Sequence, residues 1–170
     1  MSKERKETLA VEDTWPIGAY MYKGPKLYNE IVEGFKRKKI IASLCTGCGR
    51  VFFPPRNICG RCWRKIDARR EVSDVGTITS FTISPEIKRG QVKVLGLDPV
   101  EAGIVKDGER LIMVYVNFDG TDTNYATVLL NAKPEEVHVG MRVKAVWKEK
   151  PEGLLSDMEG VEPIRKESTQ

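Results

Sequence analysis

The stretch CTGCGRVFFPPRNICGRCW, from Cys45 to Trp63, decides the fold that we expect for this chain of 170 residues. It holds all four cysteines of the sequence as two Cys-x-x-Cys pairs, which are Cys45 with Cys48 and Cys59 with Cys62. A thiolate pair with this spacing can wrap a tight turn around one edge of a zinc tetrahedron, and two such turns complete the coordination shell. Because four sulfurs leave no open position, the pattern predicts a structural zinc ion.

Three other interpretations of the paired cysteines compete with zinc. An iron tetrathiolate carrier of the rubredoxin kind uses the same pairs, but its pairs are separated by a much longer loop than the ten residues found here. A redox-active pair of the thioredoxin kind belongs at a helix start in a βαβ unit, which a β-rich ribbon does not supply. The segment could also be the remnant of a zinc site that no longer binds metal. An iron site would be red, so colour alone separates it from zinc.

The region around the cysteines is strongly basic. Between Lys36 and Arg70 the chain carries eleven basic residues and one acid, Asp67, whereas the formal net charge of the whole chain is only +4. Four thiolates on Zn²⁺ carry a net charge of about −2, so the region stays basic with the metal in place. This asymmetry indicates a partner with phosphates or carboxylates, although solvated charges on a small ribbon explain it equally well.

The rest of the chain predicts a mainly β protein. Residues 1–25, with Trp15, Tyr20 and Tyr22, form an irregular arm, and the apolar spacing after them predicts an amphipathic helix over 26–39. After the ribbon we expect five short strands in a closed or partly closed barrel. The Asp-Gly pair at 107–108 predicts a type I′ hairpin turn between the second and the third of these strands. The strands are Val75–Ile83, Ala102–Lys106, Glu109–Phe118, Tyr125–Leu130 and Val139–Trp147.

These patterns divide the chain into four parts. The expected boundaries are an arm and helix over 1–39, a zinc ribbon over 40–72, the barrel over 73–150 and a loosely ordered tail over 151–170. No apolar run approaches the roughly 20 residues that span a bilayer, and the charged start does not resemble a secretory signal. We therefore expect a cytoplasmic protein. The single histidine, His138, lies in a strand-like stretch and no catalytic motif is present, so we expect no enzymatic activity.

The order of these parts resembles a known family. A helix, the two cysteine pairs around a Pro-Pro-Arg turn, a barrel opening with GTITSFT at 76–82 and a close with VGMRV at 139–143 cover residues 26–148. The chain is similar to small proteins with a rubredoxin-like zinc ribbon and a five-stranded OB-fold, associated with acyl-CoA metabolism and long called a domain of unknown function. The resemblance implies a non-catalytic partner of thiolase-type enzymes that can bridge a thiolase and hydroxymethylglutaryl-CoA synthase. The segment 98–101 departs from the family pattern.

This resemblance gives the basic region a candidate ligand. CoA carries three phosphates and an adenine, so Arg50, Phe52, Phe53 and Arg56 are the residues that we expect to contact acyl-CoA or a partner enzyme. Alternatively, the two phenylalanines only cover the metal site, and Arg56 pairs with a carboxylate of the chain itself.

A second functional class also fits the sequence. Zinc ribbons and OB-folds both serve in single-stranded nucleic-acid binding, where bases stack on aromatic side chains along the barrel strands. Tyr115 and Phe118 are the aromatic residues that the main hairpin offers for this alternative.

Overall fold

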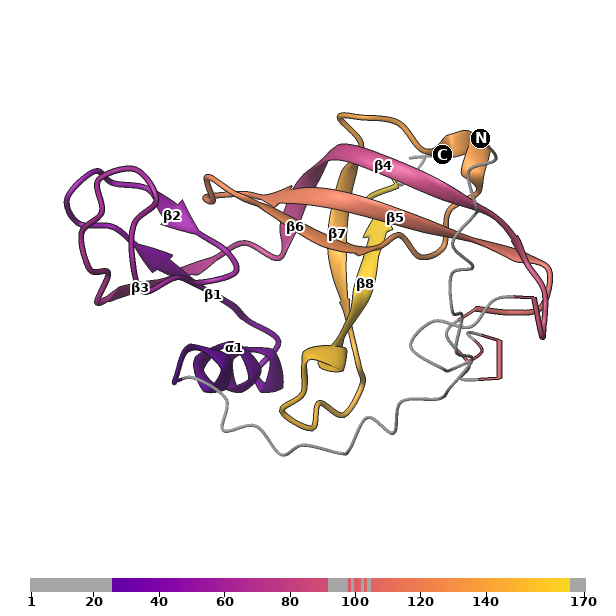
Figure 1. Ribbon diagram of the computed structural model, residues 1–170, viewed down its shortest axis with the longest axis horizontal. Coiled ribbons are helices and arrows are strands. Elements are labelled where there is room, and N and C mark those ends of the chain that lie inside the picture. Colours follow the sequence, from indigo (N-terminus) through magenta and orange to yellow (C-terminus); the bar gives the residue numbers. More distant parts are fainter. Residues whose placement is uncertain (1–25, 92–97, 99, 102, 104, 166–170) are drawn as a thin grey trace, which may run out of the picture.

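The structure is a computed structural model that describes residues 26–91, 98, 100–101, 103 and 105–165 (Figure 1). The expected arm at 1–25 lies outside the described residues. In the described residues one α-helix leads into two antiparallel sheets, so the mainly β prediction is confirmed. The elements are α1 Lys26–Lys36, β1 Ile40–Leu44, β2 Val51–Phe52, β3 Ala68–Val72, β4 Val75–Ile87, β5 Glu109–Phe118, β6 Asn124–Val128, η1 Pro134–Glu136, β7 Arg142–Trp147, η2 Leu155–Asp157 and β8 Met158–Pro163.

Helix α1 ends three residues earlier than its apolar spacing predicts. The Gly34 carbonyl accepts the N–H groups of Arg37 at 2.9 Å and Lys39 at 3.0 Å, which closes the last turn. Lys38 takes a left-handed backbone conformation with a φ of 58°, as the residue after a helix often does. The chain then reverses, and β1 begins at Ile40.

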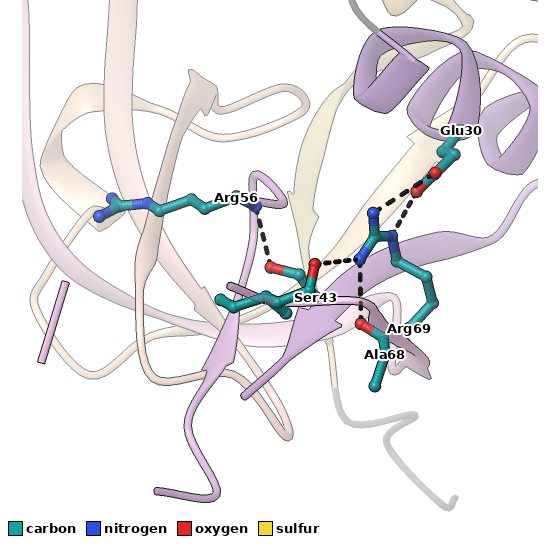
Figure 2. A network of polar contacts seen from close by, with 6 residues as sticks. Glu30, Ser43, Arg56, Ala68 and Arg69 are labelled. Carbon is teal, nitrogen blue, oxygen red and sulfur yellow. Dashed lines mark hydrogen bonds and ion pairs between the residues drawn. The ribbon is translucent and has the colours of Figure 1, made fainter. Parts of the chain in front are cut away.

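Strands β1, β2 and β3 form the small sheet of the ribbon, in the order β2-β1-β3. An ion pair between Arg69 of β3 and Glu30 of α1 fastens the helix to this sheet, and the Arg69 guanidinium also donates to the Ala68 carbonyl at 3.1 Å (Figure 2). The buried Ser43 hydroxyl of β1 accepts the N–H of Arg56 at 2.9 Å, which ties the segment before the second cysteine pair to β1.

The larger sheet is a curled, five-stranded antiparallel sheet with the order β6-β5-β4-β7-β8. Irregular register at two points of β4 bends the strand, as β-bulges do. The two edges meet at a parallel bridge between Leu129 and Val161, where the Leu130 N–H donates to the Val161 carbonyl at 2.7 Å. Gly160 makes this approach possible because a Cβ there would lie 2.7 Å from the Val128 carbonyl oxygen. The sheet is therefore a half-barrel whose edges touch at one place.

One predicted strand, the predicted turn type and the predicted loose tail were wrong. The described residues of the Ala102–Lys106 segment form turns and bends, and β5 pairs instead with β4, whose Ile87 carbonyl accepts the Gly108 N–H at 2.9 Å. Of the Asp-Gly pair only Gly108 is left-handed, so the turn is not type I′. The tail predicted to be loose contains β8, which pairs along β7. Sequence periodicity shows that a segment suits a strand, but not which strand it pairs with.

One hydrophobic core joins the helix, the ribbon and the half-barrel. Phe35 of α1 lies 6.3 Å from the Phe53 ring, and Phe53 lies 6.0 Å from Phe118 of β5. All three rings are buried in the same cluster. The sequence-based boundaries between the parts stay a prediction. No helix in the described part of the chain is long and apolar enough to cross a bilayer.

Candidate functional site

The four cysteine sulfurs converge at one end of the ribbon. Their Sγ atoms all lie within 4.8 Å of one another, with 3.4 Å between Cys45 and Cys62 and 3.6 Å between Cys48 and Cys59. Tetrahedral zinc with bonds of about 2.3 Å requires sulfurs about 3.8 Å apart. The two shortest spacings differ from this value by only a few tenths of an ångström, and the donor set matches structural zinc.

Two turns with the same backbone hydrogen bonds hold these sulfurs. In the first turn, Cys45 donates its N–H to the Arg50 carbonyl at 2.8 Å and accepts the N–H of Gly49 at 2.8 Å. The second turn, residues 59–64, repeats both bonds at the equivalent positions, each at 2.9 Å. Each pair is therefore positioned by its own local backbone, and the metal site closes when the two turns meet.

The pKa values of the clustered cysteines favour a bound cation. The pKa of Cys59 is lowered to about 6, because the backbone amides of Cys62 and Arg61 stabilise its thiolate. The pKa of Cys48 is raised to about 11: the Arg50 amide lowers it, but burial and the neighbouring sulfurs outweigh that effect. Without a metal the four groups cannot all ionise near neutral pH. A bound Zn²⁺ holds all four as thiolates.

The structure separates the predicted contact residues into two groups. Phe52 and Phe53 are 3% and 1% exposed, so neither ring has a surface to offer a ligand, which corrects the expectation that they contact CoA or a partner. Phe52 packs beside the buried Cys45 and Cys59 and covers the metal site. Arg56 lies outside it, with its guanidinium carbon 5.4 Å from the centre of the Phe52 ring.

Phe53 has a different role, which is to fasten the ribbon to the half-barrel. Its N–H donates to the Thr123 hydroxyl at 2.8 Å, and its carbonyl accepts that hydroxyl at 2.7 Å. Next to it, Val51 donates to the Asp122 carboxylate at 2.8 Å and accepts the Asp122 N–H at 2.8 Å. The sequence shows Asp122 only as a loop charge. No local signal indicates this role, because the partners lie about seventy residues apart.

The exposed end of the ribbon, residues 45–65, is here called the ribbon tip. It contains five basic residues and no acidic one. Its four arginines are exposed, and within the described ranges none has a carboxylate within 4 Å, so the expected alternative of an internal pair for Arg56 is not found. Gly47 lets one of them lie across the first cysteine turn, since a Cβ at Gly47 would be 2.7 Å from Cδ of Arg64. The four are Arg50, Arg56, Arg61 and Arg64.

The other candidate residues lie on the half-barrel. Tyr115 is 52% exposed, whereas Phe118 is 1% exposed in the core and offers no surface for stacking. His138 is exposed in the loop before β7, with Nδ1 3.0 Å from the Glu136 carbonyl oxygen. These residues do not join the metal site in the ribbon.

Comparison with known proteins agrees with this geometry. Residues 32–67 match the family model of the ChsH2 rubredoxin-like zinc ribbon domain. A DUF35 domain-containing scaffold protein of Methanocaldococcus jannaschii is 25% identical over 118 residues, which are 66% of this chain and 70% of that protein.

Two solved structures have a similar fold. A DUF35 family protein of unknown function from Sulfolobus solfataricus is 25% identical, with a TM-score of 0.53 over 75% of this chain and 81% of that one. The structure of an Ltp2-ChsH2(DUF35) aldolase has a TM-score of 0.54 at 17% identity, over 84% of this chain and 98% of that one. The resemblance inferred from the sequence is confirmed. The chain carries a rubredoxin-like zinc ribbon whose four clustered cysteines, Cys45, Cys48, Cys59 and Cys62, could bind a zinc ion, and over most of its length it is similar to DUF35 proteins.

Proposed function

We propose that this protein is a non-catalytic cytoplasmic scaffold that docks thiolase-type enzymes of CoA-thioester metabolism. The observation that carries the proposal is the ribbon tip. Four sulfurs would saturate the shell of a zinc ion bound there, so the ion would have no open position for chemistry. Around this rigid centre, four exposed arginines lie without carboxylate partners in the described structure. Such a surface is suited to recognition of an anionic partner.

Similar proteins support a scaffold role. The Methanocaldococcus jannaschii relative is named a scaffold protein, and the solved structure of similar fold that contains ChsH2 is described as an Ltp2-ChsH2(DUF35) aldolase. The family resemblance supplies a more specific partner, a thiolase or a hydroxymethylglutaryl-CoA synthase.

The proposal extends to acyl-CoA itself. The guanidinium groups of Arg50 and Arg56 are suited to the phosphates of CoA, because they form paired charge-assisted hydrogen bonds. We further propose that the half-barrel is an OB-fold. Its five-stranded order and the parallel bridge from Leu129 to Val161 support this assignment.

Copurification from the native host tests the docking. We expect a thiolase or a synthase to accompany the tagged protein, and we expect Arg56→Glu to abolish the association. Arg56→Lys should retain part of it, and Lys150→Glu, the same charge reversal on an exposed loop outside the ribbon, should retain all of it. Metal content by mass spectrometry shows whether each variant keeps its ribbon. A protein that associates with neither enzyme nor CoA contradicts the proposal.

Single-stranded nucleic acid is the competing ligand. Two aromatic residues of the main hairpin favoured this function. Phe118 is buried in the core, so only Tyr115 is exposed for stacking on a base. A fluorescence titration with single-stranded RNA over a series of salt concentrations distinguishes the two functions. Micromolar binding that weakens steeply with salt would favour nucleic acid over an enzyme partner.

A further inference from the structure

Trp63 is the most exposed large hydrophobic side chain in the described structure. Its side chain and backbone together are 79% exposed, although tryptophan usually contributes its large apolar area to a core. Its backbone N–H donates to the Cys59 carbonyl at 2.9 Å, within the same turn. The ribbon therefore positions the backbone of Trp63 firmly and leaves its indole ring without cover.

The backbone conformation of Trp63 makes this exposure more unusual. Its φ is +59°, in the left-handed region that a side chain with a Cβ seldom adopts. The equivalent position in the first cysteine turn is Gly49, with a φ of +74°. Glycine is the residue that this position favours, because it has no Cβ to collide with the backbone. The second turn thus accepts strain to carry an exposed indole, and such strain is typical of functional positions.

The surroundings of Trp63 indicate what it meets. The flanking Arg61 and Arg64 are exposed and have no ion pair in the described part of the chain. Ile58, in the same turn region, is 56% exposed and forms a β-bridge with Lys65. Exposed apolar side chains next to exposed arginines in one turn region suit an interface whose partner has an apolar pocket with a negative rim.

We propose that Trp63 is the anchor of the ribbon tip, and that it enters an apolar pocket rimmed by carboxylates on the enzyme that the scaffold docks. The inference rests on the proposed scaffold function and names the residue and the partner surface that carry it. Tryptophan and arginine are the residues that most often dominate binding energy at such interfaces.

A protein partner fits these residues better than a nucleic acid does. Sequence-tolerant nucleic-acid binders stack successive bases on several aromatic rings. Trp63 is the single exposed aromatic residue of the ribbon tip, since Phe52 and Phe53 are buried. The neighbouring Ile58 is aliphatic and suits a hydrophobic pocket rather than a base.

A titration of the zinc-loaded full chain against the purified thiolase and the purified synthase of the same genome tests the anchor. We expect Trp63→Gly to weaken binding by about thirty-fold or more, the loss typical of an interface hot spot. Trp63→Phe should restore part of the affinity. Glycine is suited to this backbone position, so Trp63→Gly should keep its zinc, and its thermal midpoint should not fall below that of the wild type. Tyr115→Ala, which removes another exposed aromatic ring on the half-barrel, should bind as the wild type does.

Each of the other outcomes overturns a specific part of the proposal. If the wild type binds an enzyme and Trp63→Gly binds it equally well, the anchor is wrong and the scaffold function stands. If the wild type binds neither enzyme, both proposals fall together. If affinity is unchanged between low and high salt, the carboxylate rim is wrong. If single-stranded RNA binds instead and Trp63→Gly abolishes that binding, the occupant is a nucleic acid and the protein pocket is wrong.

Discussion

At the scale of single residues, the two cysteine turns place a glycine and a tryptophan in the same backbone conformation. Gly49 and Trp63 donate equivalent hydrogen bonds and have φ angles of +74° and +59°. A left-handed conformation costs a residue with a Cβ about 1–2 kcal/mol. Because the backbone hydrogen bonds of the two turns match, a substitution at position 49 measures the free energy that the left-handed conformation costs a residue with a Cβ at position 63.

We expect Gly49→Ala to lower the free energy of unfolding by about 1 kcal/mol. A Cβ at Gly49 would have no atom within 4 Å, so backbone strain is the expected cause. Urea denaturation of the zinc-loaded protein measures the change. Gly60→Ala is the matched control, because its nearest contact would be 3.9 Å away and its φ is outside the left-handed region. Equal stability of the two variants would contradict the strain argument.

At the scale of elements, the two-residue strand β2 connects the ribbon to the half-barrel. Its Val51, and Phe53 directly after it, exchange hydrogen bonds with Asp122 and Thr123 in the loop before β6. The Phe53 ring then enters the core 4.9 Å from the Tyr125 ring. This junction, rather than the length of the strand, holds the ribbon in place.

Replacing Thr123 with valine tests the junction. Thr123→Val keeps the shape of the side chain but leaves the Phe53 N–H and carbonyl without their partner, so we expect a loss of about 1–3 kcal/mol in unfolding free energy. Thr123→Ser retains the hydroxyl and should be much closer to the wild type. Denaturant titration of the three proteins gives the comparison. A valine variant as stable as the serine variant would show that these hydrogen bonds do not stabilise the fold.

At the scale of the whole molecule, the metal site and the half-barrel depend on one another. Val51 and Phe53 belong to the same buried cluster as Val116 and Phe118 of β5. The first cysteine turn directly precedes the segment that carries them, and the second begins five residues after it. A ribbon that unfolds therefore removes side chains from the core of the sheet.

Zinc removal should accordingly destabilise the whole protein. Chelation, or Cys48→Ser, should abolish the single zinc ion expected per chain. Loss of a buried phenylalanine from a core costs about 3–5 kcal/mol, which corresponds to a fall of about 10 °C in the thermal midpoint. Circular dichroism and mass spectrometry measure both effects. A half-barrel that melts at its original temperature after chelation would show that the two sheets are independent.

Several features were predictable because their signals are local. The spacing of the cysteines indicates the zinc site, and the apolar pattern from Lys26 indicates α1 and the face it buries. The strands β4, β5, β6 and β7 follow from short-range alternation, with small errors at their ends. The edge strand β8, MEGVEP, was not predictable because a glycine and a proline weaken its propensity and its pairing with β7 holds it in place.

The sequence by itself determined the zinc ligands, the helix and the basic character of the ribbon, because each depends on neighbours a few residues apart. Only the tertiary structure decided which residues of the ribbon face a partner. It buried Phe53 against Thr123 and Tyr125, and it left Arg56 and Trp63 exposed. The physical reason is that burial depends on contacts between segments far apart in the chain, and local pattern carries no record of them.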